Sequence, residues 1–212
     1  MAVTFQVGVT GHRAERLAHA DRGALHRSTE ALLRHTRDEV LSACHDGPCT
    51  LQLLSSLAEG SDRLVAEVAL RLGYELVCPL PLPPADFEQD FATAESRAQF
   101  QSLLARSAHV FVVSDQSAAH GGGDTSRVAA YERAGRFITD ESRLLIAIWD
   151  GEDARGRGGT GQVVDEAVVL GLPVAWIPLD RPDDVIVRDV DGHLHPLAAI
   201  GDVVRAVLRS AA

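Results

Sequence analysis

Short apolar runs rich in β-branched residues recur along the chain, at intervals long enough to hold a helix. A run such as Leu-Leu-Ile-Ala-Ile-Trp at 144–149 is apolar throughout, which is typical of a strand buried on both faces of a parallel sheet. The segments between the runs carry apolar residues at helical spacing, as in 21–42 and 59–72. The six predicted strands are Val3–Val9, Thr50–Leu54, Glu75–Val77, His109–Val113, Leu144–Trp149 and Pro173–Ile177.

Strands that alternate with helices predict an α/β fold. Further helices are expected over 92–107, 126–139 and 163–170. Because crossovers between parallel strands are right-handed, we expect a doubly wound, mainly parallel Rossmann-like sheet of six to seven strands, with helices on both faces. Residues 1–180 would form this domain. Residues 181–212 would be appended to it as a hairpin around Asp191-Gly192, over 185–197, and a closing helix over 198–209.

Charge and composition exclude several classes of function. The 212 residues include 30 acidic and 20 basic ones, a net charge of −10, whereas proteins that grip phosphate backbones are usually basic. We therefore expect no nucleic-acid polymer as partner. All basic residues are arginine, which excludes the lysine of a phosphate-binding GxxxxGK[ST] loop and the Schiff-base lysine of pyridoxal enzymes.

The remaining composition points to an ordinary cytoplasmic protein. No apolar run approaches the ~18 residues of a membrane span, and the chain begins directly with a strand pattern instead of a leader. We expect no membrane partner. The three cysteines form no CxxC pair, so we expect them to be reduced and structural. Two histidines in the hairpin, His193 and His195, lack a third ligand, and neither a metal nor a cofactor is predicted.

Candidate chemistry gathers after the strands, because ligands of open α/β sheets bind at the carboxyl ends of the strands. The first strand is followed by Gly11, His12 and Arg13, whose guanidinium could hold a phosphate or carboxylate. The fifth is followed by Gly-Arg-Gly-Gly-Thr-Gly at 156–161 and then a helix. Glycines and free N–H groups at a helix N-terminus attract phosphate, so Gly158, Gly159, Thr160 and Gly161 are predicted to bind it. The alternatives are a flexible surface loop and an arginine paired with a surface acid.

Further candidates are less specific. Ser55, Ser56 and Gly60 follow the second strand and could contact a sugar or base, as could Glu59 and Ser61. Asp62 is more readily interpreted as a helix-capping residue. Asp115 could accept a hydrogen bond from a ligand hydroxyl, although Asp also forms turns. Tyr131 lies one helical turn before Gly135, and its ring could stack on a base or belong to the core.

Four segments together resemble the SLOG superfamily, named for the Smf/DprA and LOG proteins. They are VGVTGHR, SLAEGSDRLVAEVAL, LPPADFEQDF and LIAIWDGEDARGRGGTGQVVDEAVVLGLPVAWI, in the same order over residues 3–178. The resemblance implies a Rossmann-like fold, nucleotide-type ligands and homodimers or larger assemblies. Some members cleave an N-glycosidic bond.

One departure weakens the enzymatic interpretation. LOG hydrolases resemble one another in a PGGxGTxxE loop with a catalytic glutamate, and if Thr160 matches the threonine of that loop, the glutamate falls on Val163. The nearest acids are Asp165 and Glu166. The first prediction is therefore a protein that binds a nucleotide or nucleotide derivative and could serve as a sensor. The alternative is a phosphoribohydrolase-like N-glycosidase for nucleoside monophosphates, with Glu59 and Glu166 as its catalytic carboxylates.

Overall fold

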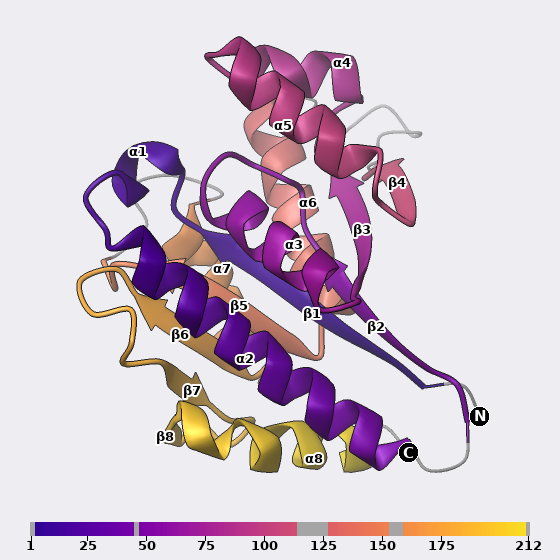
Figure 1. The fold of residues 1–212 in the computed structure, drawn as a ribbon, viewed down its shortest axis with the longest axis vertical. Helices are drawn as coiled ribbons and strands as arrows, with labels where there is room; N and C mark the ends of the chain where they lie inside the picture. Colours follow the sequence, from indigo (N-terminus) through magenta and orange to yellow (C-terminus); the bar gives the residue numbers. More distant parts are fainter. Residues whose placement is uncertain (1–2, 45–46, 114–126, 153–158, 211–212) are drawn as a thin grey trace.

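A computed structural model describes residues 3–44, 47–113, 127–152 and 159–210. Eight strands within these residues form one sheet (Figure 1), in the order β4-β3-β2-β1-β5-β6-β7-β8. The first six strands along the chain pair in parallel, and β7 and β8 are antiparallel. Their bounds are β1 Val3–Gly11, β2 Cys49–Leu54, β3 Glu75–Leu80, β4 His109–Val112, β5 Leu144–Trp149, β6 Val174–Pro178, β7 Ile186–Arg188 and β8 Leu194–Pro196.

Helices cover both faces of the sheet. In Figure 1, α2, α3, α5 and α8 lie in front of it, whereas α6 and α7 lie behind. The α/β doubly wound class predicted from the sequence is therefore confirmed, and all six main helices lie within a few residues of their predicted positions. The bounds are α1 Ala14–Leu17, α2 Arg22–Ala43, α3 Ser61–Arg71, α4 Pro84–Phe87, η1 Glu88–Asp90, α5 Ala94–Leu104, α6 Arg127–Glu141, α7 Thr160–Val169, η3 Leu197–Ala199 and α8 Ile200–Ser210.

The order of the strands reverses at β1. The chain moves outward from β1 through β2 and β3 to β4, then returns to pair β5 with the other side of β1. Such a switch point leaves a crevice at the carboxyl ends of the central strands, because the helices that follow them diverge to opposite faces. The region after β1 and β5 is therefore where the fold itself provides room for a ligand.

The sheet differs from the prediction at both ends. It has eight strands because the hairpin around Asp191-Gly192 pairs with β6 and extends the same sheet. At the opposite end, the apolar run at 109–113 also predicts a strand, which is β4, but Val110, Phe111 and Val112 are exposed. The reason is that β4 is an edge strand, paired with β3 alone among the described strands.

The prediction of three reduced cysteines is wrong for two of them. Cys44 and Cys49 form a disulfide with a Cα–Cα separation of 6.2 Å. Cys44 is the C-cap residue of α2, and Cys49 is the first residue of β2. Cys78 is free and buried. No helix among the described residues is long and apolar enough to cross a membrane.

Candidate functional site

A cavity of about 510 Å³ lies at the switch point of the sheet, and we call it the edge cavity. It is bounded by the end of β1, the β2–α3 loop, one side of α6 and the start of α7. The predicted ligand-binding residues that line it are Gly11, His12, Arg13, Ser56, Tyr131, Gly159, Thr160 and Gly161. Polar or aromatic residues that line it without having been predicted to bind ligand are Thr10, Glu15, Arg16, Asp62, Trp149 and Glu152.

Arg13 places a cation at the edge cavity. It lies two residues after the end of β1 and is the N-cap residue of α1. Its guanidinium carbon lies 5.7 Å from the centre of the Tyr131 ring, a cation–π distance. Within the part of the chain that the structure describes, Arg13 forms no ion pair. Its charge is therefore available to an anionic ligand.

The turn that carries Arg13 is fixed by the β2–α3 loop. Ser61 donates to the carbonyl oxygen of His12 from its backbone N–H, at 3.1 Å, and from its hydroxyl, at 2.8 Å. Gly60 has φ +97°, and a Cβ there would lie 2.6 Å from the same carbonyl oxygen. A Cβ on Gly11 would lie 2.5 Å from Ser61 Cβ. The two glycines thus permit a close packing of loops, rather than a close approach of ligand.

His12 belongs to a charged cluster beside the cavity. Its Nε2 lies 2.9 Å from Asp150 Oδ1, and Arg16 donates to the other carboxylate oxygen of Asp150. Partial burial acts to raise the pKa of Asp150. The hydrogen bonds from His12 and the Glu152 N–H, together with the charge of Arg16, outweigh burial, so the pKa is lowered overall. Asp150 therefore stays ionised and ties the β1 turn to the end of β5.

Asp62 is the buried carboxyl of the edge cavity, with 7% of its surface exposed. Its Oδ2 accepts hydrogen bonds from the Ala58 N–H, at 3.2 Å, and from the Ser55 hydroxyl, at 3.4 Å. Burial raises its pKa to about 6, although these hydrogen bonds and the charge of Arg13 oppose the shift. The sequence favoured a helix cap, but the side chain closes the loop before α3 and faces the cavity.

The two serines after β2 differ in role. Ser55 is fully buried and does not line the edge cavity. Its hydroxyl oxygen accepts from the Leu57 N–H at 3.1 Å, so it shapes the loop and supports Asp62. Ser56 lines the cavity and donates to the carbonyl oxygen of Pro79 at 2.8 Å.

Tyr131 also lines the cavity. Its hydroxyl donates to Asp90, and its ring packs near Phe87.

The start of α7 is open toward the edge cavity. Its N-cap residue is Gly159, which supplies no side chain to cap the helix. The first helical bond runs from Val163 N–H to Gly159 O, which leaves the N–H groups of Thr160 and Gly161 outside the helical pattern. Asp115 and Gly158, also predicted to bind ligand, lie outside the described residues.

The two predicted catalytic carboxylates lie away from the edge cavity. Glu59 lines a second cavity, of about 560 Å³, on the other side of the β2–α3 loop, as does Gly60. There Glu59 accepts a hydrogen bond from Ser96. Glu166 lies on α7, where it accepts from Gln162 at 3.0 Å and lies 3.9 Å from Arg136. The structure therefore does not bring Glu59 and Glu166 together.

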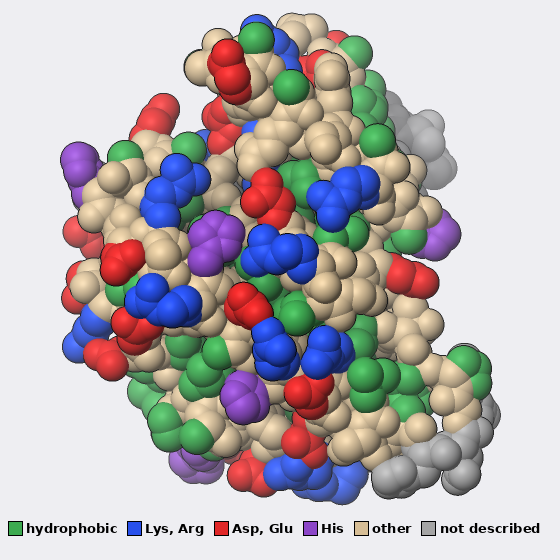
Figure 2. Space-filling view, viewed as in Figure 1, with side chains coloured by type: hydrophobic (Ala, Val, Ile, Leu, Met, Phe, Trp, Pro, Cys, Tyr) green, Lys and Arg blue, Asp and Glu red, His purple; other side chains and the backbone are tan. Residues whose placement is uncertain are grey.

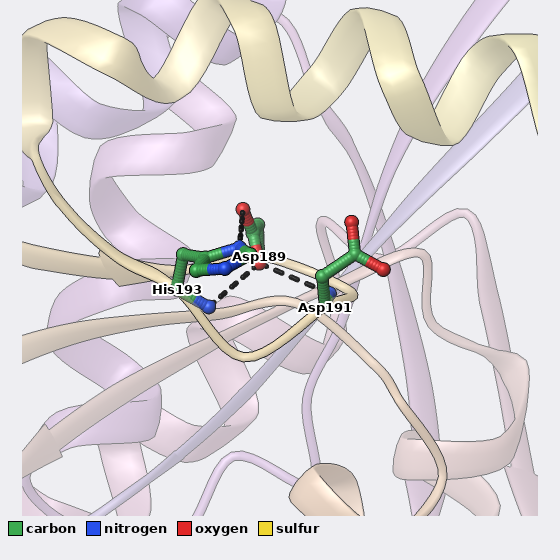
Figure 3. Close-up of side chains that lie close together, drawn as sticks. All are labelled: Asp189, Asp191 and His193. Atoms are coloured by element: carbon green, nitrogen blue, oxygen red, sulfur yellow. Dashed lines mark hydrogen bonds and ion pairs between the residues drawn. The ribbon is translucent and has the colours of Figure 1, made fainter.

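A separate group of acids and histidines occupies the β7–β8 hairpin (Figure 3). Asp189 Oδ1 accepts from the N–H groups of Asp191, at 3.0 Å, and His193, at 2.9 Å. Its Oδ2 lies 2.8 Å from His195 Nε2. The hydrogen bond from His195 is the main reason that the pKa of Asp189 falls to about 2. These contacts close the hairpin and account for the group without an ion.

Comparison with known proteins supports the fold. No family model matches the chain, and no curated protein matches it. Among solved structures, DNA processing protein A (DprA) from Streptococcus pneumoniae is similar, with a TM-score of 0.53 and 18% sequence identity. The match covers 99% of this chain and 57% of that chain. This chain therefore has the fold of a part of DNA processing protein A.

Proposed function

We propose that the edge cavity binds a nucleotide or a nucleotide-derived small molecule, with its phosphate between Arg13 and the start of α7. The observation that carries this proposal is the convergence of two anion-attracting features on one cavity. One is a guanidinium without an ion pair among the described residues, and the other is the N-terminus of α7, whose N-cap Gly159 has no side chain to cap it. Each favours phosphate.

The rest of the cavity suits the neutral part of such a ligand. Its volume of about 510 Å³ lies within the ~300–1,000 Å³ usual for small-molecule sites. Tyr131 and Trp149 contribute aromatic surface, and Ala134 and Gly135 contribute small residues on α6. A flat base has room to pack beside such residues.

We further propose that the chain is a member of the SLOG superfamily that uses this cavity for a small ligand instead of DNA. The name of its structural neighbour refers to DNA processing, but a net charge of −10 opposes binding to a phosphate backbone. On the face seen in Figure 2, acidic and basic side chains are interspersed, without a broad basic stripe.

The two carboxylates predicted for hydrolysis lie outside the edge cavity, although other carboxylates, those of Glu15, Asp62 and Glu152, line it. An N-glycosidase of the predicted kind would use Glu59 or Glu166, and neither lines the edge cavity. The binding proposal requires only groups that do line it.

A calorimetric titration tests the proposal. AMP, ADP-ribose, NAD and cyclic AMP would each be added to the protein, with adenosine as the unphosphorylated control and a single-stranded oligonucleotide as the polymer control. We expect at least one phosphorylated nucleoside to bind, and to stabilise the fold by about 2.7 kcal/mol at 100 times its dissociation constant. Binding of the oligonucleotide alone, or of none of these compounds, would overturn the proposal.

A further inference from the structure

Asp62 has a free hydrogen-bond acceptor that faces the edge cavity. Its Oδ2 is held by Ala58 and Ser55. Its Oδ1 takes part in no hydrogen bond among the described residues, while the side chain lines the cavity and is more than nine-tenths buried. One carboxylate oxygen is thus anchored, and the other is left for whatever occupies the cavity.

Oδ1 is not one of the described polar atoms that are fully buried without a partner, so solvent in the cavity reaches it. A ligand that displaces this solvent has to supply a donor, because a carboxylate oxygen that loses water without replacement is unfavourable. The charges of Arg13 and Arg63 act on Asp62, but neither forms an ion pair with it. Arg63 bonds through Nε to Leu57 O at 2.9 Å and through Nη1 to Ser96 O at 2.8 Å, and its Nη2 has no partner among the described residues. The donor to Oδ1 therefore comes from the cavity, from water or from the ligand that displaces it.

We propose that Asp62 accepts a hydrogen bond from a sugar hydroxyl of the bound ligand, and that it makes the site selective for hydroxylated sugar phosphates. This inference rests on the proposed function, because it places the sugar next to a phosphate held by Arg13. Hydroxyl groups suit a carboxylate acceptor, which cannot donate when it is ionised. A hydrogen bond to a charged acceptor is stronger than one between neutral groups, so removing the hydroxyl should be costly.

The loop geometry supports a specific role. Asp62 follows Ser61, which is bonded to the turn that carries Arg13. The phosphate-binding cation and the sugar-binding carboxylate are therefore held by one connected pair of loops. A ligand that carries a phosphate and a sugar hydroxyl close together can contact Arg13 and Asp62 at once. Inorganic phosphate can contact Arg13 alone.

The test compares ligands that differ by one hydroxyl, in buffer with EDTA and at a pH above 6. AMP, 2′-deoxy-AMP and 3′-deoxy-AMP distinguish the hydroxyls. Ribose 5-phosphate shows whether a free sugar phosphate satisfies the site without a base. Each is titrated into the wild-type protein and the Asp62→Ala and Asp62→Asn variants. Glu67→Gln, on the opposite side of the same helix, controls for the loss of an acidic charge.

We expect the wild type to bind AMP at least ~10-fold more tightly than one of the deoxy analogues. Asp62→Ala should abolish this preference by weakening AMP alone, while Asp62→Asn, which keeps an acceptor and the shape of the side chain, should retain part of it. Glu67→Gln should keep the full preference. Asp62→Asn also serves as the test if Asp62→Ala does not fold.

Two results would overturn the inference in different ways. Equal binding of AMP and both deoxy analogues by the wild type would refute the role of Asp62 and leave the phosphate site intact. Failure of every phosphorylated ligand to bind would refute the proposed function as well.

Discussion

Ser61 and His12 lock two loops of the site together. The His12 carbonyl oxygen accepts both the backbone N–H and the hydroxyl of Ser61. Because His12 precedes Arg13 and Ser61 precedes Asp62, this contact sets the positions of the two charged side chains proposed to bind ligand. The packing that allows it depends on Gly60, which lies against the same carbonyl oxygen.

Gly60→Ala should therefore destabilise the protein more than backbone strain alone explains. Gly73 is the matched control, because it also has a positive φ, +85°, but nothing lies within 4 Å of its missing Cβ. Gly73→Ala should cost about 1–2 kcal/mol. Gly60→Ala adds a clash with the backbone of residues 12–14, and should cost at least about 2 kcal/mol more. Urea unfolding measures both, and equal losses would contradict the close packing of these loops.

Asp62 should make stability depend on pH. Its pKa is raised from 3.8 to about 6 by burial, so between these values the folded state binds more protons than the unfolded state. The free energy of unfolding then falls as pH rises through this window. Well above pH 6, the raised pKa of Asp62 lowers the free energy of unfolding by about 3 kcal/mol.

Asp62→Asn isolates this contribution, because asparagine has no carboxyl proton to exchange. Relative to the Asn variant, the wild type should lose stability steadily from pH 4 to about 6. Denaturant unfolding of both proteins at several pH values gives the difference. Parallel pH profiles would show that Asp62 titrates as an ordinary exposed carboxyl.

Arg63 should be needed for the β2–α3 loop to hold its shape. Only 2% of its surface is exposed, and its guanidinium carbon lies 4.3 Å from the centre of the Phe91 ring. Arg63→Lys keeps the charge but cannot reach both Leu57 O and Ser96 O, so it should cost about 2 kcal/mol or more. Arg71→Lys, at the exposed end of the same helix, should change stability by less than ~0.5 kcal/mol. Thermal or urea unfolding would compare the two.

The layered fold could be predicted from the sequence because its central strands are apolar on both faces. The run at 144–149 is β5, with buried strands on each side. The apolar run at 109–112 is similar, but it forms the exposed edge strand β4. A local pattern does not say whether a strand has one neighbour or two. Short helices such as α1 and α4 escaped prediction, since four residues are too few to show a helical period.

The site could be predicted in part, for a similar reason. Gly11 ends β1, Arg13 lies two residues beyond it, and Thr160 begins the helix that comes after β5. Parallel strands bring their carboxyl ends to one edge of the sheet. The position of Asp62 at a helix start predicts a capping role, and its burial cannot be read from the sequence because it depends on the loop that brings Ser55 and Ala58 to it. Glu59 lies in the same loop, but the loop turns it toward the second cavity.

Arg13 is the residue proposed to hold the phosphate of the ligand. Calorimetric titration of AMP and adenosine into the wild type, Arg13→Ala and Arg71→Ala tests it directly. Loss of a charge-assisted contact worth about 1.5–3 kcal/mol should weaken AMP binding by Arg13→Ala ~10–150-fold, while adenosine binding and the unfolding temperature change little. Arg71→Ala should bind both ligands as the wild type does. If Arg13→Ala binds AMP as tightly as the wild type, the phosphate site proposed at the edge cavity is wrong.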